Sequence, residues 1–76
     1  WASEMLMMGL RLKVGVNLSV IEQKCGPRQF WVNQEKLAMH VRDGRLQFFE
    51  HQNETRLATT PEGRVLLNSV LADIIN

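Results

Sequence analysis

Few side chains in this sequence could do chemistry as nucleophiles or metal ligands. The chain contains one cysteine, Cys25, and two histidines, His40 and His51. A single thiol cannot form an internal disulfide, a four-cysteine zinc site or an iron–sulfur cluster held by this chain alone. The two histidines lack the spacing of a metal-binding pair, so we expect a structural or solvated role for both. We therefore identify no catalytic, cofactor-binding or metal-binding residue in the chain.

Two further groups of residues allow a chemical interpretation and a structural one. Cys25 comes at the end of an expected short helix, where the negative end of the helix dipole disfavours the thiolate that a nucleophile needs. We expect it to pack as a small apolar side chain. Met5, Met7 and Met8 could bind a soft metal or a haem, but methionines at helical spacing are typical of a hydrophobic core. We expect core packing for them as well.

Length and composition restrict the class of protein. The chain has 76 residues, of which 45% are hydrophobic and 22% are charged. These values are typical of a small globular protein, and we expect a single domain over residues 1–76. Because the sequence opens at Trp1 rather than at a methionine, we expect a piece of a longer protein. No apolar run approaches the roughly 20 residues of a membrane helix and no signal peptide is recognisable, so we expect no membrane partner and a cytoplasmic location.

The first segment, Ser3 to Leu12, is rich in methionine and leucine and predicts a helix. Ser3 suits the N-cap position, and Glu4 suits the positive end of the helix dipole. Apolar residues at helical spacing predict one buried face that consists of Met5, Met8, Gly9 and Leu12 and is widened by Leu6 and Leu10. Gly9 would allow a neighbouring backbone to approach closely.

A second, short helix is predicted from a cap at Asn17 to about Lys24, followed by a stop at residues 26–27, Gly-Pro. Val20 and Ile21 should form its buried side. The connector 28–32 then carries two aromatic side chains that should turn inward, Phe30 and Trp31.

The rest of the pattern predicts a third helix, a hairpin and a closing helix. The third helix should begin at Asn33 and end at residues 43–44, with an apolar stripe of Leu37, Ala38 and Val41. The period then changes to two, which predicts a β-hairpin with its turn at residues 51–54. Thr60 and Pro61 mark the start of a helix that should run to the end of the chain. Its expected apolar face consists of Leu66, Leu67, Val70, Leu71 and Ile74.

Three helices, a hairpin and a closing helix predict an α+β fold that is mainly α and winged-helix-like. A two-stranded hairpin is not stable alone in water, so it must pack on the helices. The layout raises a winged-helix nucleic-acid-binding module as an alternative function, in which the third helix enters the major groove. The side chains that it would present are Asn33, Gln34, Lys36, Met39, His40 and Arg42.

Charge argues against this alternative. Acidic residues lie where phosphate contacts require lysine or arginine, namely Glu35, Asp43, Glu50 and Glu54. Nine basic residues against eight acidic ones give a net charge of only +1. This balance provides little attraction to a polyanion, so nucleic acid is not the partner that we favour.

Three stretches together resemble the C-terminal domain of the oxygen-independent coproporphyrinogen III oxidase family, which includes haem-chaperone-like relatives. Residues 4–16, EMLMMGLRLKVGV, resemble its run E-x-x-M-x-G-L-R-L-x-x-G-V. Residues 44–46, GRL, resemble its G-x-L step into the hairpin. Residues 60–68, TPEGRVLLN, resemble its closing L-T-P-x-G-R-x-L-x-N. The stretches occur in the right order over nearly the whole chain, and the departures lie in the loops at 26–31 and 51–54.

The resemblance implies that this chain is an accessory domain of a larger radical S-adenosylmethionine (radical SAM) protein. Such a protein carries a preceding barrel domain, in which three cysteines hold a [4Fe–4S] cluster that cleaves S-adenosylmethionine. Family members use the radical for oxidative decarboxylation of coproporphyrinogen III propionates, or bind haem in the chaperone branch. None of those functional residues lies in this chain. Porphyrin or haem would therefore be a partner only through the preceding domain.

For this domain we expect a docking role, in which it packs on the radical domain and shapes the substrate cleft. The motivation is a surplus of apolar side chains that a small core cannot bury, namely Met5, Met7, Leu10, Phe30, Trp31 and Phe49. Arg11 belongs to the first family motif. It would suit a salt bridge within the domain, a contact to the barrel or a contact to a propionate.

Overall fold

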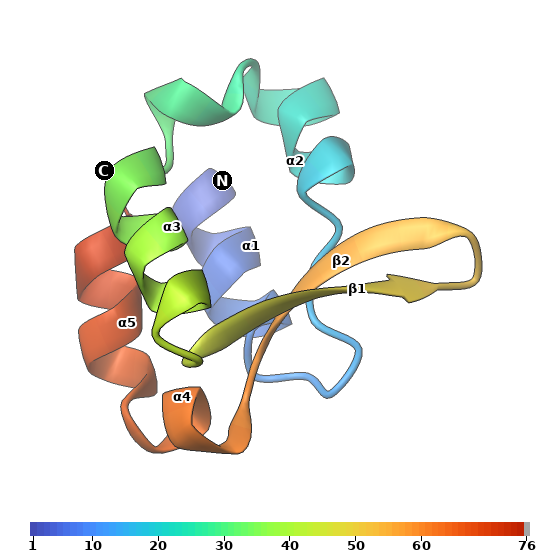
Figure 1. Ribbon diagram of the computed structural model, residues 1–76. Coiled ribbons are helices and arrows are strands. Elements are labelled where there is room, and N and C mark those ends of the chain that lie inside the picture. Colours follow the sequence, from blue (N-terminus) through green and yellow to red (C-terminus); the bar gives the residue numbers. More distant parts are fainter. Residues whose placement is uncertain (76) are drawn as a thin grey trace.

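The computed structural model describes residues 1–75 and consists of helices around one hydrophobic core, with a hairpin that projects to one side (Figure 1). The order of elements confirms an α+β fold that is mainly α. Its elements are α1 (Ala2–Gly9), α2 (Leu18–Cys25), the short 3₁₀ helix η1 (Arg28–Phe30), α3 (Gln34–Arg42), β1 (Leu46–His51), β2 (Glu54–Thr59), α4 (Pro61–Val65) and α5 (Leu67–Ile74).

One hydrophobic cluster holds these elements together. Every helix except α4 and η1 contributes to it, and both strands add a leucine. The largest fully buried side chains are Leu6, Leu10, Ile21, Val32, Leu46, Leu57, Val70 and Ile74. Burial of a leucine or isoleucine side chain contributes about 1.5–3 kcal/mol, so this cluster is the main source of stability.

The first helix begins and ends earlier than the sequence pattern predicts. Trp1 occupies the N-cap position and Ser3 lies inside the helix, so the expected serine cap is wrong. The buried stripe is Ala2, Leu6 and Leu10, whereas Met8 is 72% exposed. The helix stops because the chain turns back to place Val16 against β2, and a Cβ atom at Gly9 would lie only 2.6 Å from the Val16 Cβ atom. Leu12 lies beyond this stop and is exposed as well.

Asn17 and Thr60 are confirmed as caps, and Asn33, the predicted start of the third helix, caps that helix as well. The Asn17 side chain accepts a hydrogen bond from the backbone N–H of Ser19, and the Asn33 side chain accepts one from that of Lys36. Thr60 accepts one from the N–H of Gly63 in the same way. Each cap satisfies an N–H group that the helix itself leaves unpaired, which is worth about 1 kcal/mol.

The connector between α2 and α3 buries one of its two aromatic side chains. Trp31 lies in the core, and its indole N–H donates to the Gly26 carbonyl oxygen at 2.9 Å. Phe30 is 69% exposed, so the expectation that both rings turn inward is wrong for Phe30. Phe30 is the last residue of η1, whereas Trp31 follows it with a non-helical φ of −129°, so the two side chains leave the backbone in different directions. Val20 of α2 is likewise more exposed than predicted, whereas Ile21 is buried.

The hairpin is longer and its turn tighter than the sequence pattern predicts. The strands pair from Leu46 opposite Thr59 to His51 opposite Glu54. Only Gln52 and Asn53 form the turn, and both have positive φ, as a type I′ turn requires. An isolated antiparallel bridge between Val16 and Leu57 joins the hairpin to the loop after α1.

The closing helix is interrupted, which corrects the prediction of one continuous helix. The break lies at Leu66, whose φ and ψ of −106° and 23° belong to neither helix. Leu66 is 48% exposed, whereas the other four leucine, valine and isoleucine residues of the predicted apolar face are buried. Because α4 packs on the start of the hairpin and α5 packs on α3, the chain must change direction between them.

Gly63→Ala should destabilise the chain, although alanine normally favours a helix over glycine by about 1 kcal/mol. The added methyl group would collide with the backbone oxygen of Arg45, so α4 would have to move away from the hairpin. We expect the free energy of unfolding to fall by about 2 kcal/mol, measured by urea denaturation. The control is Glu62→Ala, at the exposed neighbouring position, which should cost less than about 1 kcal/mol. Equal stability of the two variants would contradict the close packing of α4.

Candidate functional site

The three side chains most able to act as nucleophiles or metal ligands lie apart in the structure. Cys25 is half-buried at the end of α2 and packs against the core, as expected. His51 lies at the end of β1, with its ring 6.3 Å from that of Phe49. His40 lies on the buried side of α3. Within residues 1–75, no three histidine, cysteine or acidic side chains gather as a metal site would require.

His40 has a structural role. For both histidines we expected either a structural or a solvated role. His40 is 3% exposed and lies between Arg45 and Asp73. The Arg45 Nε–H donates to His40 Nδ1 at 2.6 Å, and His40 Nε2 lies 2.8 Å from the Asp73 carboxylate. Because Nδ1 accepts, the ring proton lies on Nε2 and is donated to the carboxylate. This chain of hydrogen bonds joins α3, the start of β1 and α5.

Helix α3 differs from the surface that the nucleic-acid alternative requires. His40 is buried, so it is not an outward-facing reader of bases, which corrects that expectation. Asn33 is engaged as the cap of α3. Basic side chains near α3 are paired with carboxylates, Arg28 with Glu22 and Arg45 with Asp43. Gln34, Lys36 and Arg42 remain exposed on this helix.

Only some of the apolar side chains that we expected to exceed the capacity of the core are exposed in the structure. Leu10 and Trp31 belong to the core, so counting them as surplus is wrong. Met5 is partly buried against the core, whereas Met7 and Phe30 are exposed, and Phe49 is half-buried. Further exposed apolar side chains were not on the predicted list, namely Trp1, Met8, Leu12, Val14, Val20, Phe48, Val65 and Leu66.

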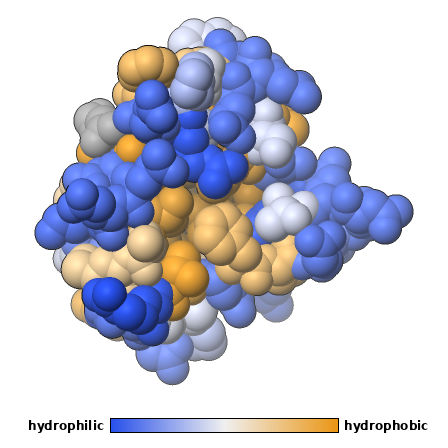
Figure 2. Space-filling model, turned by 45° about the horizontal axis from the view of Figure 1, so that its top comes forward, coloured by the Kyte–Doolittle hydropathy of each residue, from blue (hydrophilic) through white to orange (hydrophobic). Residues whose placement is uncertain are grey.

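One group of apolar side chains lines a shallow hollow between α3 and β1, which we call the hairpin hollow. Figure 2 shows apolar side chains gathered in the middle of this face, with hydrophilic ones around them. The hollow has a volume of about 380 Å³ and is lined by Arg28, Gln34, Leu37, Ala38, Val41, Arg42 and Phe48. It could receive an apolar group, and the basic residues on its rim already have acidic partners.

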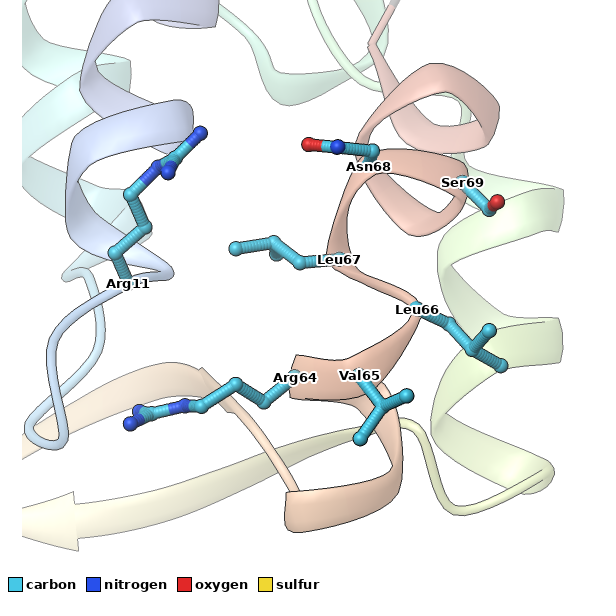
Figure 3. A pocket seen from close by; sticks show the side chains of 7 residues that line it. All are labelled: Arg11, Arg64, Val65, Leu66, Leu67, Asn68 and Ser69. Atoms are coloured by element: carbon cyan, nitrogen blue, oxygen red, sulfur yellow. The ribbon is translucent and has the colours of Figure 1, made fainter.

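A second hollow, which we call the arginine groove, lies where the segment after α1 faces α4 and α5. It has a volume of about 440 Å³ and is lined by Arg11, Arg64, Val65, Leu66, Leu67, Asn68 and Ser69. Figure 3 shows Arg11 and Asn68 pointing toward each other, with Leu67 between them and Arg64 extending along the same side. The groove therefore combines two guanidinium groups and one amide above an apolar floor.

The arginines of the groove differ from the other four arginines of the chain. Each of the others makes an ion pair with a carboxylate, namely Arg28–Glu22, Arg42–Asp43, Arg45–Asp43 and Arg56–Glu54. Arg11 donates through Nε to the Met7 backbone oxygen and to no carboxylate. The Arg64 backbone N–H donates to the Thr60 carbonyl oxygen, but its guanidinium makes no hydrogen bond or ion pair with any of residues 1–75. Lys13, which shares an adjoining hollow with Arg64, makes no ion pair with these residues either.

These unpaired cations can bind an anion, because guanidinium groups match carboxylate and phosphate in geometry and charge. Of the polar residues in the groove, the sequence pattern indicated Arg11 as a contact residue but not Arg64 or Asn68. The signal was present, since both belong to the TPEGRVLLN stretch, but nothing in the sequence places that stretch beside Arg11.

Comparison with known proteins gives one match. The family model for the HemN C-terminal domain matches residues 2–66, which cover most of the chain. No curated protein matches the chain, and no solved structure does.

His40→Leu should lower the free energy of unfolding by about 2 kcal/mol, measured by urea denaturation. Leucine nearly preserves the volume but leaves the Arg45 Nε–H and the Asp73 carboxylate without their partner. The matched control is His51→Leu at the hairpin turn, which should change stability by less than about 0.5 kcal/mol. If the two substitutions cost the same, the buried hydrogen-bonded chain would not be a stabilising feature.

Proposed function

Because the chain belongs to the family of HemN C-terminal domains, we propose that it is a non-catalytic domain that packs on the catalytic domain of a larger protein. That protein would be a radical SAM enzyme similar to oxygen-independent coproporphyrinogen III oxidase, or a haem chaperone of the same family. By packing there, the domain would shape the cleft that receives the substrate. The cytoplasm is the proposed location. No helix within residues 1–75 has the length and apolar character needed to span a membrane.

The exposed apolar side chains are the observation that carries this proposal. Phe30 and Met8 are about two-thirds exposed or more, and Val65 is 84% exposed. Scattered apolar residues are common on surfaces, but here Phe48 lines the hairpin hollow, and Val65 and Leu66 line the arginine groove. A surface that is both hollowed and apolar favours contact with another protein surface over contact with water.

The residues of this chain do not fit a [4Fe–4S] cluster. A cluster of this kind requires several thiolate ligands, and the only cysteine of the sequence is Cys25, half-buried against the core. The cluster and S-adenosylmethionine would therefore belong to the catalytic domain. What this chain would contribute is surface, through the apolar faces of its helices and its hairpin.

Removal of residues 1–76 from the longer protein should lower its stability and its activity. The catalytic domain would lose the surface that covers it, so we expect its midpoint of thermal unfolding to fall by several degrees. Product formation should fall at least about tenfold because the cleft is incomplete. Reductive cleavage of S-adenosylmethionine should persist, since the cluster ligands lie elsewhere. Unchanged stability together with unchanged product formation would refute the docking role.

Nucleic-acid binding has no comparable support, since the basic side chains beside α3 are largely paired with acids. We expect no shift of random duplex DNA in a gel at low salt, where electrostatic binding is strongest. A shift that disappears as salt is raised would instead favour the winged-helix alternative. The control is Lys36→Gln on the exposed side of α3. This substitution would weaken such a shift if the helix contacted the phosphates.

A further inference from the structure

The arginine groove carries positive charge without a counter-charge. Arg11 and Arg64 line it, and Lys13 lines the hollow that adjoins it. None of the three makes an ion pair with residues 1–75, although the other arginines all do so. The three side chains are exposed, so water solvates them and they repel one another only weakly. Such an arrangement gains stability when an anion is added.

The walls of the groove indicate what kind of partner brings that anion. Val65 is almost fully exposed beside Arg64, and Leu66 is half exposed. A free carboxylate molecule could neutralise the guanidinium groups but would leave these apolar side chains in water. A protein surface with an acidic side chain among apolar ones would cover both. Protein interfaces are typically built this way, with arginine enriched at their most strongly binding positions.

We propose that the arginine groove docks on the domain that precedes this chain in the same polypeptide and receives aspartate or glutamate carboxylates from it. Arg11 and Arg64 would pair with these carboxylates through two N–H groups each, and the Asn68 amide would add a further donor. This inference rests on the proposed docking function and specifies its surface and its chemistry. The hairpin hollow provides no such match, because Arg28 and Arg42 on its rim already face Glu22 and Asp43.

Hydrogen exchange of the full-length protein tests the surface. Amides of residues 62–69 should exchange at least about tenfold more slowly in the full-length protein than in the 76-residue chain. Arg64→Gln and Arg11→Gln in the full-length protein should remove most of this protection at 50 mM NaCl. Added salt should weaken the protection of the wild type more than that of either variant, because each variant has already lost one of the charged pairs that salt would screen. Both side chains are exposed, so the variants should keep the fold.

Two matched variants separate charge from apolar contact. Arg42→Gln removes the same charge from the exposed side of α3 and should leave the protection of residues 62–69 unchanged. Val65→Ser should lower the protection but keep its dependence on salt. If Arg42→Gln has the same effect as Arg64→Gln, net charge alone is responsible and the proposed site is wrong.

Chemical coupling identifies the source of the carboxylate. In full-length Arg64→Lys, a carbodiimide should join the introduced amine to an aspartate or glutamate of the preceding domain, found by mass spectrometry. The same treatment of Arg42→Lys should give no such link. A link only to carboxylates of residues 1–76 would overturn the proposal. So would a result in which Arg64→Gln keeps the protection but raises the KM for the substrate, because the carboxylate would then come from the substrate.

Failure of the inference can be told apart from failure of the proposed function. If protection in the full-length protein appears over the hairpin hollow but not over the groove, the domain docks through another surface and only the inference is wrong. If no segment of the chain gains protection in the full-length protein, the docking function itself is wrong.

Discussion

The junction between α3 and β1 is the point on which the arrangement of the other elements depends. At this junction the Arg45 backbone N–H donates to the His40 carbonyl oxygen, and its own carbonyl oxygen accepts from the Thr60 N–H. Its guanidinium bonds to the His40 ring, which in turn bonds to Asp73 of α5. The same carbonyl oxygen leaves no room for a side chain at Gly63. One residue thereby fixes α3, α4 and α5 relative to the hairpin.

This constraint determines where the groove forms. Helix α4 is held against the start of the hairpin, and α5 must turn its apolar face toward α3. The chain therefore breaks at Leu66, which leaves Val65 and Leu66 on the surface. The same break carries Arg64 and Asn68 to the side where Arg11 lies. An exposed apolar pair and two unpaired guanidinium groups follow from one change of chain direction.

The interior of the molecule and its surface differ in how well their polar and apolar groups are matched. The buried residues are apolar apart from His40 and Thr59, and the side chains of both form hydrogen bonds. The surface carries apolar side chains and, in the groove, cations that residues 1–75 do not neutralise. An isolated small domain gains nothing from either feature. In the docking role that we propose, another protein surface would cover both.

The sequence by itself determined the helix caps at Asn17, Asn33 and Thr60 and the order of elements, because capping and periodicity are local properties of the chain. It also determined that the single Cys25 cannot hold a cluster, since ligand number follows from counting residues. The tertiary structure alone decided that α1 buries Leu6 rather than Met8, that the closing helix breaks at Leu66, and that His40 is buried. Each of these depends on contacts between segments distant in the chain. The groove is the clearest case, because 53 positions separate Arg11 from Arg64 and only packing of α4 and α5 places the two side chains in one groove.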